Sequence, residues 1–183
     1  MLLASMTTFY ANGSPTASLS TDDLRDALEQ TFEKIGSLDR VLLLPPDATR
    51  LFSRAGELTV LCRELLEDRV TDIMPALGTH SAMKPKQLDH MFPGVPHELF
   101  RPHRWRDDVV TLGTIPASFV SEVTGGLYRK PWKAQVNKLL RDGGHDLIFS
   151  LGQVVPHEVI GMANYNKNVF VGTGGQEGIN ESH

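Results

Sequence analysis

The sequence contains very little cysteine, since Cys62 is the only one among 183 residues. No disulfide can therefore form within the chain, and this cysteine usage is typical of a reducing compartment. The first residues, MLLASMTTFY, lack the basic leader of a signal peptide, and their apolar stretch is too short for a signal core or a membrane span. These absences predict a cytoplasmic protein that is not anchored in a membrane.

An excess of positive charge is absent as well. The 18 Lys and Arg residues are outnumbered by 22 Asp and Glu residues, which gives a formal net charge of -4, and the basic residues are scattered along the chain. Proteins that bind nucleic acid concentrate Lys and Arg on one surface. The sequence therefore predicts no nucleic-acid partner.

Familiar metal and phosphate motifs are missing too. No HExxH or CxxC pattern occurs, and the glycine-rich segment 172–178 (GTGGQEG) lacks both the GKS/T ending of a P-loop and the spacing of a dinucleotide fingerprint. A flexible turn is the plainer interpretation of those glycines. Any functional site must be sought in less common arrangements.

The composition that is present is that of an ordinary globular protein, with 40% hydrophobic and 22% charged residues. The length favours one domain spanning residues 1–183. Residues 1–20 are rich in Ser, Thr, Gly and Ala and show no sustained period, so they are predicted to be an irregular lead-in.

Apolar periodicity predicts helices that alternate with buried strands. From Asp22 to Ile35 the spacing is helical, with Ser20 or Thr21 available as N-cap and Gly36 at the end. The same spacing predicts helices near 58–66 and through Trp132, Val136, Leu139 and Leu140.

Continuous apolar runs at 40–46, 70–77 and 146–150 are typical of strands covered on both faces, and 109–115 and 169–171 are also predicted to be strands. The alternation predicts an α/β fold with a Rossmann-like parallel sheet flanked by helices.

Polar residues that follow the apolar runs are the first candidates for a site, because ligands of open α/β sheets bind beyond the carboxyl ends of the strands. Asp47 and Arg50 follow the 40–46 run, His80 follows the 70–77 run, and His157 comes after the 146–150 run. We expect Asp47, His80 and His157 to lie at one edge of the sheet.

Each candidate also has a purely structural interpretation. Asp47 can cap a helix and Arg50 can be a surface arginine. A loop histidine such as His80 is usually solvated, and Pro156 and Glu158 beside His157 suggest the start of a helix. Lys167 can be a solvated flank, and His183 at the chain end can be frayed.

Taken in order, the motifs resemble the N-terminal domain of the nickel-dependent lactate racemase family. VLLLPPDATR is similar to that family's apolar strand followed by D-x-T-R, ALGTH to its A-x-G-x-H loop, and PHRWRDDVVTLGTIP to a later segment. The family then has a histidine, a lysine ten residues later and a histidine sixteen residues after that, and here these positions hold His157, Lys167 and His183.

The resemblance implies a role for each candidate. Lys167 would carry a nickel-pincer nucleotide, a pyridinium mononucleotide, through a thioamide, and His183 would bind the nickel. His80 and His157 would be the two catalytic histidines, while Asp47 and Arg50 would line the cofactor and substrate site. One departure is GMANYNK in place of the family's G-G-R-K run before the lysine, which implies a pocket of different shape.

The implied function is racemisation or epimerisation of a 2-hydroxy acid by hydride transfer. Cofactor-maturation proteins would be partners, together with a second, C-terminal domain that these 183 residues do not contain, so the chain alone is expected to be inactive. The alternative is a non-catalytic nucleotide- or ligand-binding α/β domain. A third hypothesis is a zinc hydrolase that uses His80, His157 and His183.

Overall fold

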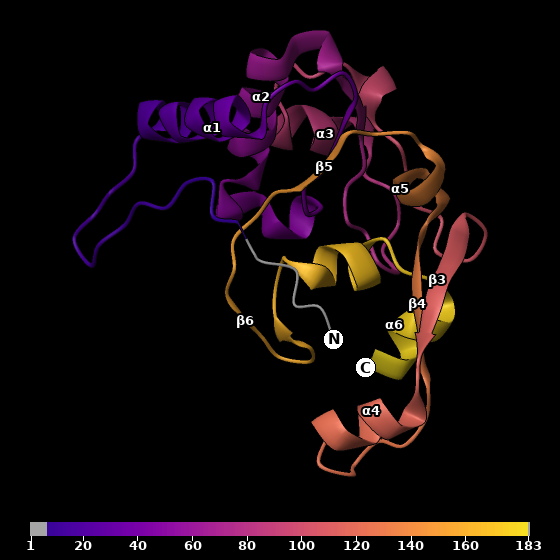
Figure 1. Ribbon diagram of the computed structural model, residues 1–183. Helices are drawn as coiled ribbons and strands as arrows, with labels where there is room; N and C mark the ends of the chain where they lie inside the picture. Colours follow the sequence, from indigo (N-terminus) through magenta and orange to yellow (C-terminus); the bar gives the residue numbers. More distant parts are fainter. Residues whose placement is uncertain (1–6, 183) are drawn as a thin grey trace.

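A three-stranded parallel sheet forms the centre of the computed structural model, which describes residues 7–182 (Figure 1). The strand order is β2–β1–β5, with β1 at Val41–Leu44, β2 at Val70–Ile73 and β5 at Leu147–Ser150. Helices α1 (Thr21–Ile35) and α2 (Ala55–Leu66) pack against it. The predicted Rossmann-like α/β architecture is confirmed.

The middle strand β1 explains why the sequence shows an unbroken apolar run. All four of its side chains are buried. Val41 and Leu43 belong to the main core beneath α1 and α2, whereas Leu42 and Leu44 face a second cluster on the other side of the sheet. Burying each leucine contributes about 1.5–3 kcal/mol, so covering both faces makes β1 the anchor of the fold.

Helix α1 begins and ends where the sequence predicts. The Ser20 side chain accepts a hydrogen bond from the Asp23 backbone N–H at 3.1 Å, and the Asp23 carboxylate accepts one from the Ser20 backbone N–H at 2.7 Å. This capping box satisfies two backbone donors that the first helical turn leaves free. Gly36, with a φ of 94°, ends the helix.

Helix α2 packs closely against a further helix, and several shorter helical elements complete the fold. Gly56 of α2 lies against helix α3 (Pro85–Met91), and a Cβ there would come within 2.1 Å of the Met91 carbonyl oxygen, so only glycine permits this approach. The remaining helical elements are η1 (Ala48–Ser53), η2 (Glu67–Arg69), η3 (His97–Leu99), α4 (Ala117–Val123), α5 (Lys138–Asp142), η4 (Asn168–Gly172) and α6 (Gln176–Ser182).

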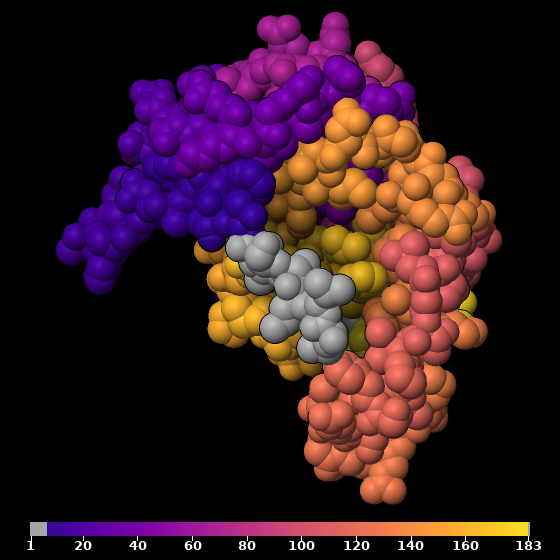
Figure 2. All heavy atoms as spheres, viewed as in Figure 1, coloured from indigo at the N-terminus to yellow at the C-terminus, as the bar shows by residue number. Residues whose placement is uncertain are grey.

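A separate antiparallel pair, β3 (Val109–Ile115) and β4 (Trp132–Asn137), lies beside the central sheet and carries α4 at its far end, where Figure 2 shows a projecting lobe. The strand at 109–115 is as predicted. The helix predicted through Trp132, Val136, Leu139 and Leu140 is wrong in its first half, because residues 132–137 pair with β3.

The change from strand to helix in this segment occurs at Asn137. Its side chain accepts a hydrogen bond from the Leu139 backbone N–H at 2.9 Å and so caps α5. Apolar side chains at 132, 134 and 136 also fit the two-residue period of a strand. Pairing with β3 decides between two patterns that the same residues satisfy.

The strand predicted at 169–171 is also wrong. These residues lie in η4, a π-helical turn. Gly172 packs so closely that a Cβ there would come within 2.5 Å of the Ala76 Cβ, and the Thr173 hydroxyl donates to the Val169 carbonyl at 2.7 Å. Residues 169–171 therefore form part of a tight turn that packs against the loop after β2, and they do not form a strand.

Residues 7–20 contain neither helix nor strand, as predicted for the lead-in, whose first six residues lie outside the described part of the chain. Among residues 7–182, none of the helices combines the length and apolar character that crossing a bilayer requires.

Candidate functional site

The cavity at the strand ends

A cavity of about 290 Å³ lies where the loops after β1 and β2 meet the segment that contains η4. Five of the six candidate residues line it. They are Asp47, Arg50, His80, His157 and Lys167. The sixth, His183, lies outside the described residues. The structure therefore brings together side chains that are separated by up to 120 positions in the sequence.

Asp47 and His80 form a hydrogen-bonded pair within this cavity. One Asp47 carboxylate oxygen, Oδ2, is 2.7 Å from Nδ1 of His80, and the other, Oδ1, accepts from the Thr49 backbone N–H at 3.1 Å. Asp47 is thus the N-cap of η1 and the partner of a histidine at once. The carboxylate is nearly buried, while the His80 side chain is 58% exposed and can meet a ligand.

Two opposing effects act on the Asp47 carboxyl group. Burial disfavours its charged form, but hydrogen bonds from Thr49 and His80 together favour that form more strongly, so the pKa of Asp47 is lowered. The carboxylate is therefore ionised at neutral pH and can only accept hydrogen bonds.

Replacing Asp47 with Asn tests this charge, because Asn preserves the helix cap. A lowered folded-state pKa stabilises the protein at pH values above the unfolded pKa, and that contribution is lost as the pH falls through the folded pKa. We expect Asp47→Asn to have a lower free energy of unfolding than the wild type at pH 7, and we expect this difference to narrow below about pH 4. Urea unfolding of both proteins at pH 7 and below about pH 4 measures the difference. The same difference under both conditions would contradict an ionised Asp47 carboxylate in the folded protein.

His157 lies on a small hairpin made of β6 (Pro156–His157) and β7 (Gly161–Met162). Its Nδ1 accepts from the Val159 backbone N–H at 3.2 Å, and the Ile160 backbone N–H points at the same atom from 3.5 Å. The predicted helix start at His157 is wrong, because residues 158–160 form a turn and Gly161, whose φ is 83°, pairs with His157 in β7. The turn itself supplies the donors that hold the ring.

Lys167 is half-buried between two cavities. One is the cavity just described, and the other, of about 70 Å³, shares Arg50 and Lys167 with it. Burial lowers the pKa of Lys167, and the positive charge of Arg50 lowers it further, while Asp47 and Glu158 oppose the shift. A lysine in such surroundings has a larger unprotonated fraction and is a better nucleophile.

Sequence reasoning missed the polar network that positions Lys167. Asn164 accepts from the Ser150 hydroxyl at 2.7 Å and from the Asn168 amide at 2.7 Å, and donates to the Gly152 carbonyl at 2.8 Å. These contacts connect the end of β5 to the turn before η4. The sequence had no signal for this network beyond asparagines on either side of the lysine.

His103 is a second residue that only the structure explains. It is buried, its Nε2 donates to the Gly174 carbonyl at 2.9 Å, and its Nδ1 accepts from the Asn137 amide at 3.0 Å. Burial lowers the pKa of His103 and keeps the ring neutral, although the Gly174 hydrogen bond and Asp108 oppose this. The residue braces the turn between η4 and α6 and does not line the cavity.

A metal centre of several protein ligands is not found in residues 7–182, where no group of three or more His, Cys, Asp and Glu side chains could hold an ion. The zinc hypothesis and the nickel hypothesis both depend on His183, and each stays a prediction.

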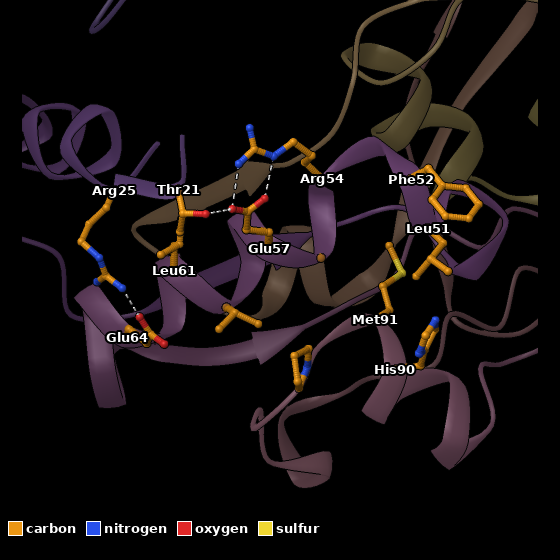
Figure 3. A pocket seen from close by; sticks show the side chains of 13 residues that line it. Thr21, Arg25, Leu51, Phe52, Arg54, Glu57, Leu61, Glu64, His90 and Met91 are labelled. Carbon is orange, nitrogen blue, oxygen red and sulfur yellow. Dashed lines mark hydrogen bonds and ion pairs between the residues drawn. The ribbon is translucent and has the colours of Figure 1, made fainter. Parts of the chain in front are cut away.

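Element η1 also borders a second, wider cavity, which is separate from the cavity at the strand ends. Its volume is about 570 Å³, and Figure 3 shows Leu51, Phe52 and Met91 in it beside two charged pairs, Arg25 with Glu64 and Arg54 with Glu57. None of the candidate residues lines it. Element η1 thus contributes Thr49 and Arg50 to one cavity and the next two residues to the other.

Comparison with known proteins

No protein-family model and no curated protein matches the sequence. Solved structures do match. A protein from Thermotoga maritima is 29% identical with a TM-score of 0.74 over 95% of this chain. The lactate racemase apoprotein from Thermoanaerobacterium thermosaccharolyticum is 22% identical with a TM-score of 0.60 over 90% of this chain.

The fold and the cavity define an α/β domain with a candidate ligand site at the carboxyl edge of a parallel sheet. More particularly, its fold is similar to part of the lactate racemase apoprotein. The chain spans 42% of the length of the Thermotoga maritima protein and 35% of the lactate racemase.

Proposed function

We propose that this chain is the N-terminal catalytic domain of an enzyme that racemises or epimerises a 2-hydroxy acid with a nickel-pincer nucleotide attached to Lys167. The observation that carries the proposal is the shared cavity of His80, His157, Lys167, Asp47 and Arg50. Similarity of fold to lactate racemase supports it.

The residues of the cavity suit such a cofactor. Lys167 offers an amine whose pKa is lowered by burial and by Arg50, which favours formation of an amide-like bond. The guanidinium of Arg50, at the border of both cavities, suits a phosphate or a carboxylate. His183 would supply the metal ligand. When bound, the cofactor would supply a reversible acceptor for hydride.

The protein groups would then handle the substrate hydroxyl and carboxylate. Arg50 would bind the substrate carboxylate or the cofactor phosphate. His80, held by Asp47, would face the substrate hydroxyl and take its proton during oxidation of the substrate carbon. This route avoids a carbanion beside a carboxylate, which is the difficulty of direct proton abstraction.

The active unit in this proposal is this chain together with a second domain, and we call it the two-domain enzyme. The two solved structures compared above are each more than twice as long as this chain. A second domain would exclude water from the cleft and hold the substrate from the other side.

We expect the two-domain enzyme, coexpressed with cofactor-maturation proteins and supplied with nickel, to interconvert the enantiomers of a 2-hydroxy acid such as lactate. The 183-residue chain prepared in the same way should be inactive. Chiral chromatography over a panel of 2-hydroxy acids measures both. Binding of nucleotide without turnover of any panel member would instead support the ligand-binding alternative.

A further inference from the structure

We propose that Asn164 is a positioning residue for Lys167: its side chain fastens the turn before the lysine to the end of β5 and so keeps the amine within the cavity at the strand ends. The contacts that carry this inference all lie within the chain. Its purpose, a fixed amine for attachment of a cofactor, rests on the proposed function.

The backbone before Lys167 adopts an uncommon conformation. Asn164 has a φ of 59° and Tyr165 a φ of 47°, and this left-handed region is disfavoured for residues that carry a Cβ. The Lys167 backbone N–H donates to the Asn164 carbonyl at 3.0 Å across this turn. The direction in which the lysine leaves the turn therefore depends on two residues whose conformation must be held by other contacts.

The side chain of Asn164 supplies those contacts. Its oxygen accepts from the Ser150 hydroxyl and from the Asn168 amide, each at 2.7 Å, and its amide donates to the Gly152 carbonyl at 2.8 Å. Gly152 has a φ of 148°, and a Cβ there would lie only 3.4 Å from the Asn164 side chain. The end of β5, the turn and the residue after Lys167 are thus joined through one side chain.

Glycine at position 164 would fit the backbone but could not make these contacts. The G-G-R-K run of the family that the sequence resembles would place glycines at 164 and 165, so a side chain that anchors the turn is a feature of this chain. Without Asn164, the buried Asn168 amide would keep only its 3.2 Å bond to the Ser150 hydroxyl. A turn anchored so weakly can move away from β5 and admit water to the amine.

Contact with water changes the protonation of Lys167 in a known direction. Burial disfavours the charged amine and lowers its pKa, so a looser turn should raise the pKa toward the ordinary lysine value of about 10.4. The other ionisable groups around the amine, which a substitution of Asn164 leaves in place, are Arg50, Asp47, His80, His157 and Glu158.

The test is the pH profile of amine acetylation in the 183-residue chain. The protein is treated with acetic anhydride from about pH 7 to 11, and the peptide that contains Lys167 is quantified by mass spectrometry against the peptide of exposed Lys130, which corrects for decay of the reagent. We expect the midpoint for Lys167 in the wild type to lie below about 10.4 and the midpoint in Asn164→Gly to move up toward that value. An unchanged midpoint in Asn164→Gly would overturn the inference.

Tyr165→Gly is the matched control. It relieves the left-handed backbone at the neighbouring position, but the Tyr165 side chain is 62% exposed and its removal leaves every Asn164 contact in place. The profile of this variant should be that of the wild type. An equal shift in both glycine variants would assign the effect to the backbone and contradict a role for the Asn164 side chain.

Ser150→Ala decides the question if Asn164→Gly does not fold, because it removes one anchor of the Asn164 side chain and leaves the turn intact. It should shift the Lys167 midpoint in the same direction by a smaller amount, and the absence of any shift would refute the inference. The expected shifts, found together with a matured two-domain enzyme that carries no adduct on Lys167, would overturn the proposed function and support the role of Asn164.

Discussion

Replacing Lys167 with Arg should reduce turnover of the two-domain enzyme to background. Arginine keeps the positive charge and most of the length of the side chain, but its guanidinium stays protonated and cannot form the covalent link. The half-buried amine, whose pKa is lowered by burial and by Arg50, is the group that the proposal depends on. Chiral chromatography of enzyme matured with nickel measures the loss.

A matched control is Lys130→Arg. Lys130 is exposed, is 3.7 Å from Glu181 and does not line the cavity. This variant should keep full activity. Substantial racemisation by Lys167→Arg would show that Lys167 contributes only charge, and the cofactor assignment would then be wrong.

His80→Gln should lower kcat by about 10²–10⁴-fold, the usual contribution of a positioned general acid–base group. Gln can fill the space and bond to Asp47, but it cannot accept a proton at neutral pH. Steady-state rates of the wild-type and variant two-domain enzymes at neutral pH measure the loss.

The control for this variant is His97→Gln, which removes an exposed histidine that pairs with Asp89. Its rates should match those of the wild type. A His80→Gln enzyme with unchanged kcat and a raised KM would mean that His80 only binds substrate, and the proposed proton carrier would have to be sought elsewhere.

The sequence predicted those parts of the fold whose local pattern and tertiary environment agree. Val41–Leu44 is buried on both faces, and a short, unbroken apolar run that ends in prolines is typical of such a strand. Residues 132–137 satisfy the helical and the strand period alike, and only pairing with β3 decides. The π-helical turn at 168–172 depends on close contact between Gly172 and Ala76, which a local pattern cannot reveal.

The site was predictable to a similar degree. The rule that ligands gather after parallel strands selected Asp47 and His80, and the structure places their side chains 2.7 Å apart. The hydrogen bonds that orient the His157 ring could not be predicted from the sequence, because their donors are backbone N–H groups of a turn. The asparagines that anchor the segment before Lys167 act through contacts with Ser150 and Gly152, which the sequence does not bring together.

The central claim is that Lys167 carries the cofactor, and peptide-resolved mass spectrometry of protein matured with nickel tests it most directly. The account predicts an added mass of the pyridinium nucleotide on the peptide that contains Lys167, absent from Lys167→Arg and retained in Lys130→Arg. Unmodified Lys167 in wild-type protein that racemises a 2-hydroxy acid, or an adduct that persists in Lys167→Arg, would contradict it.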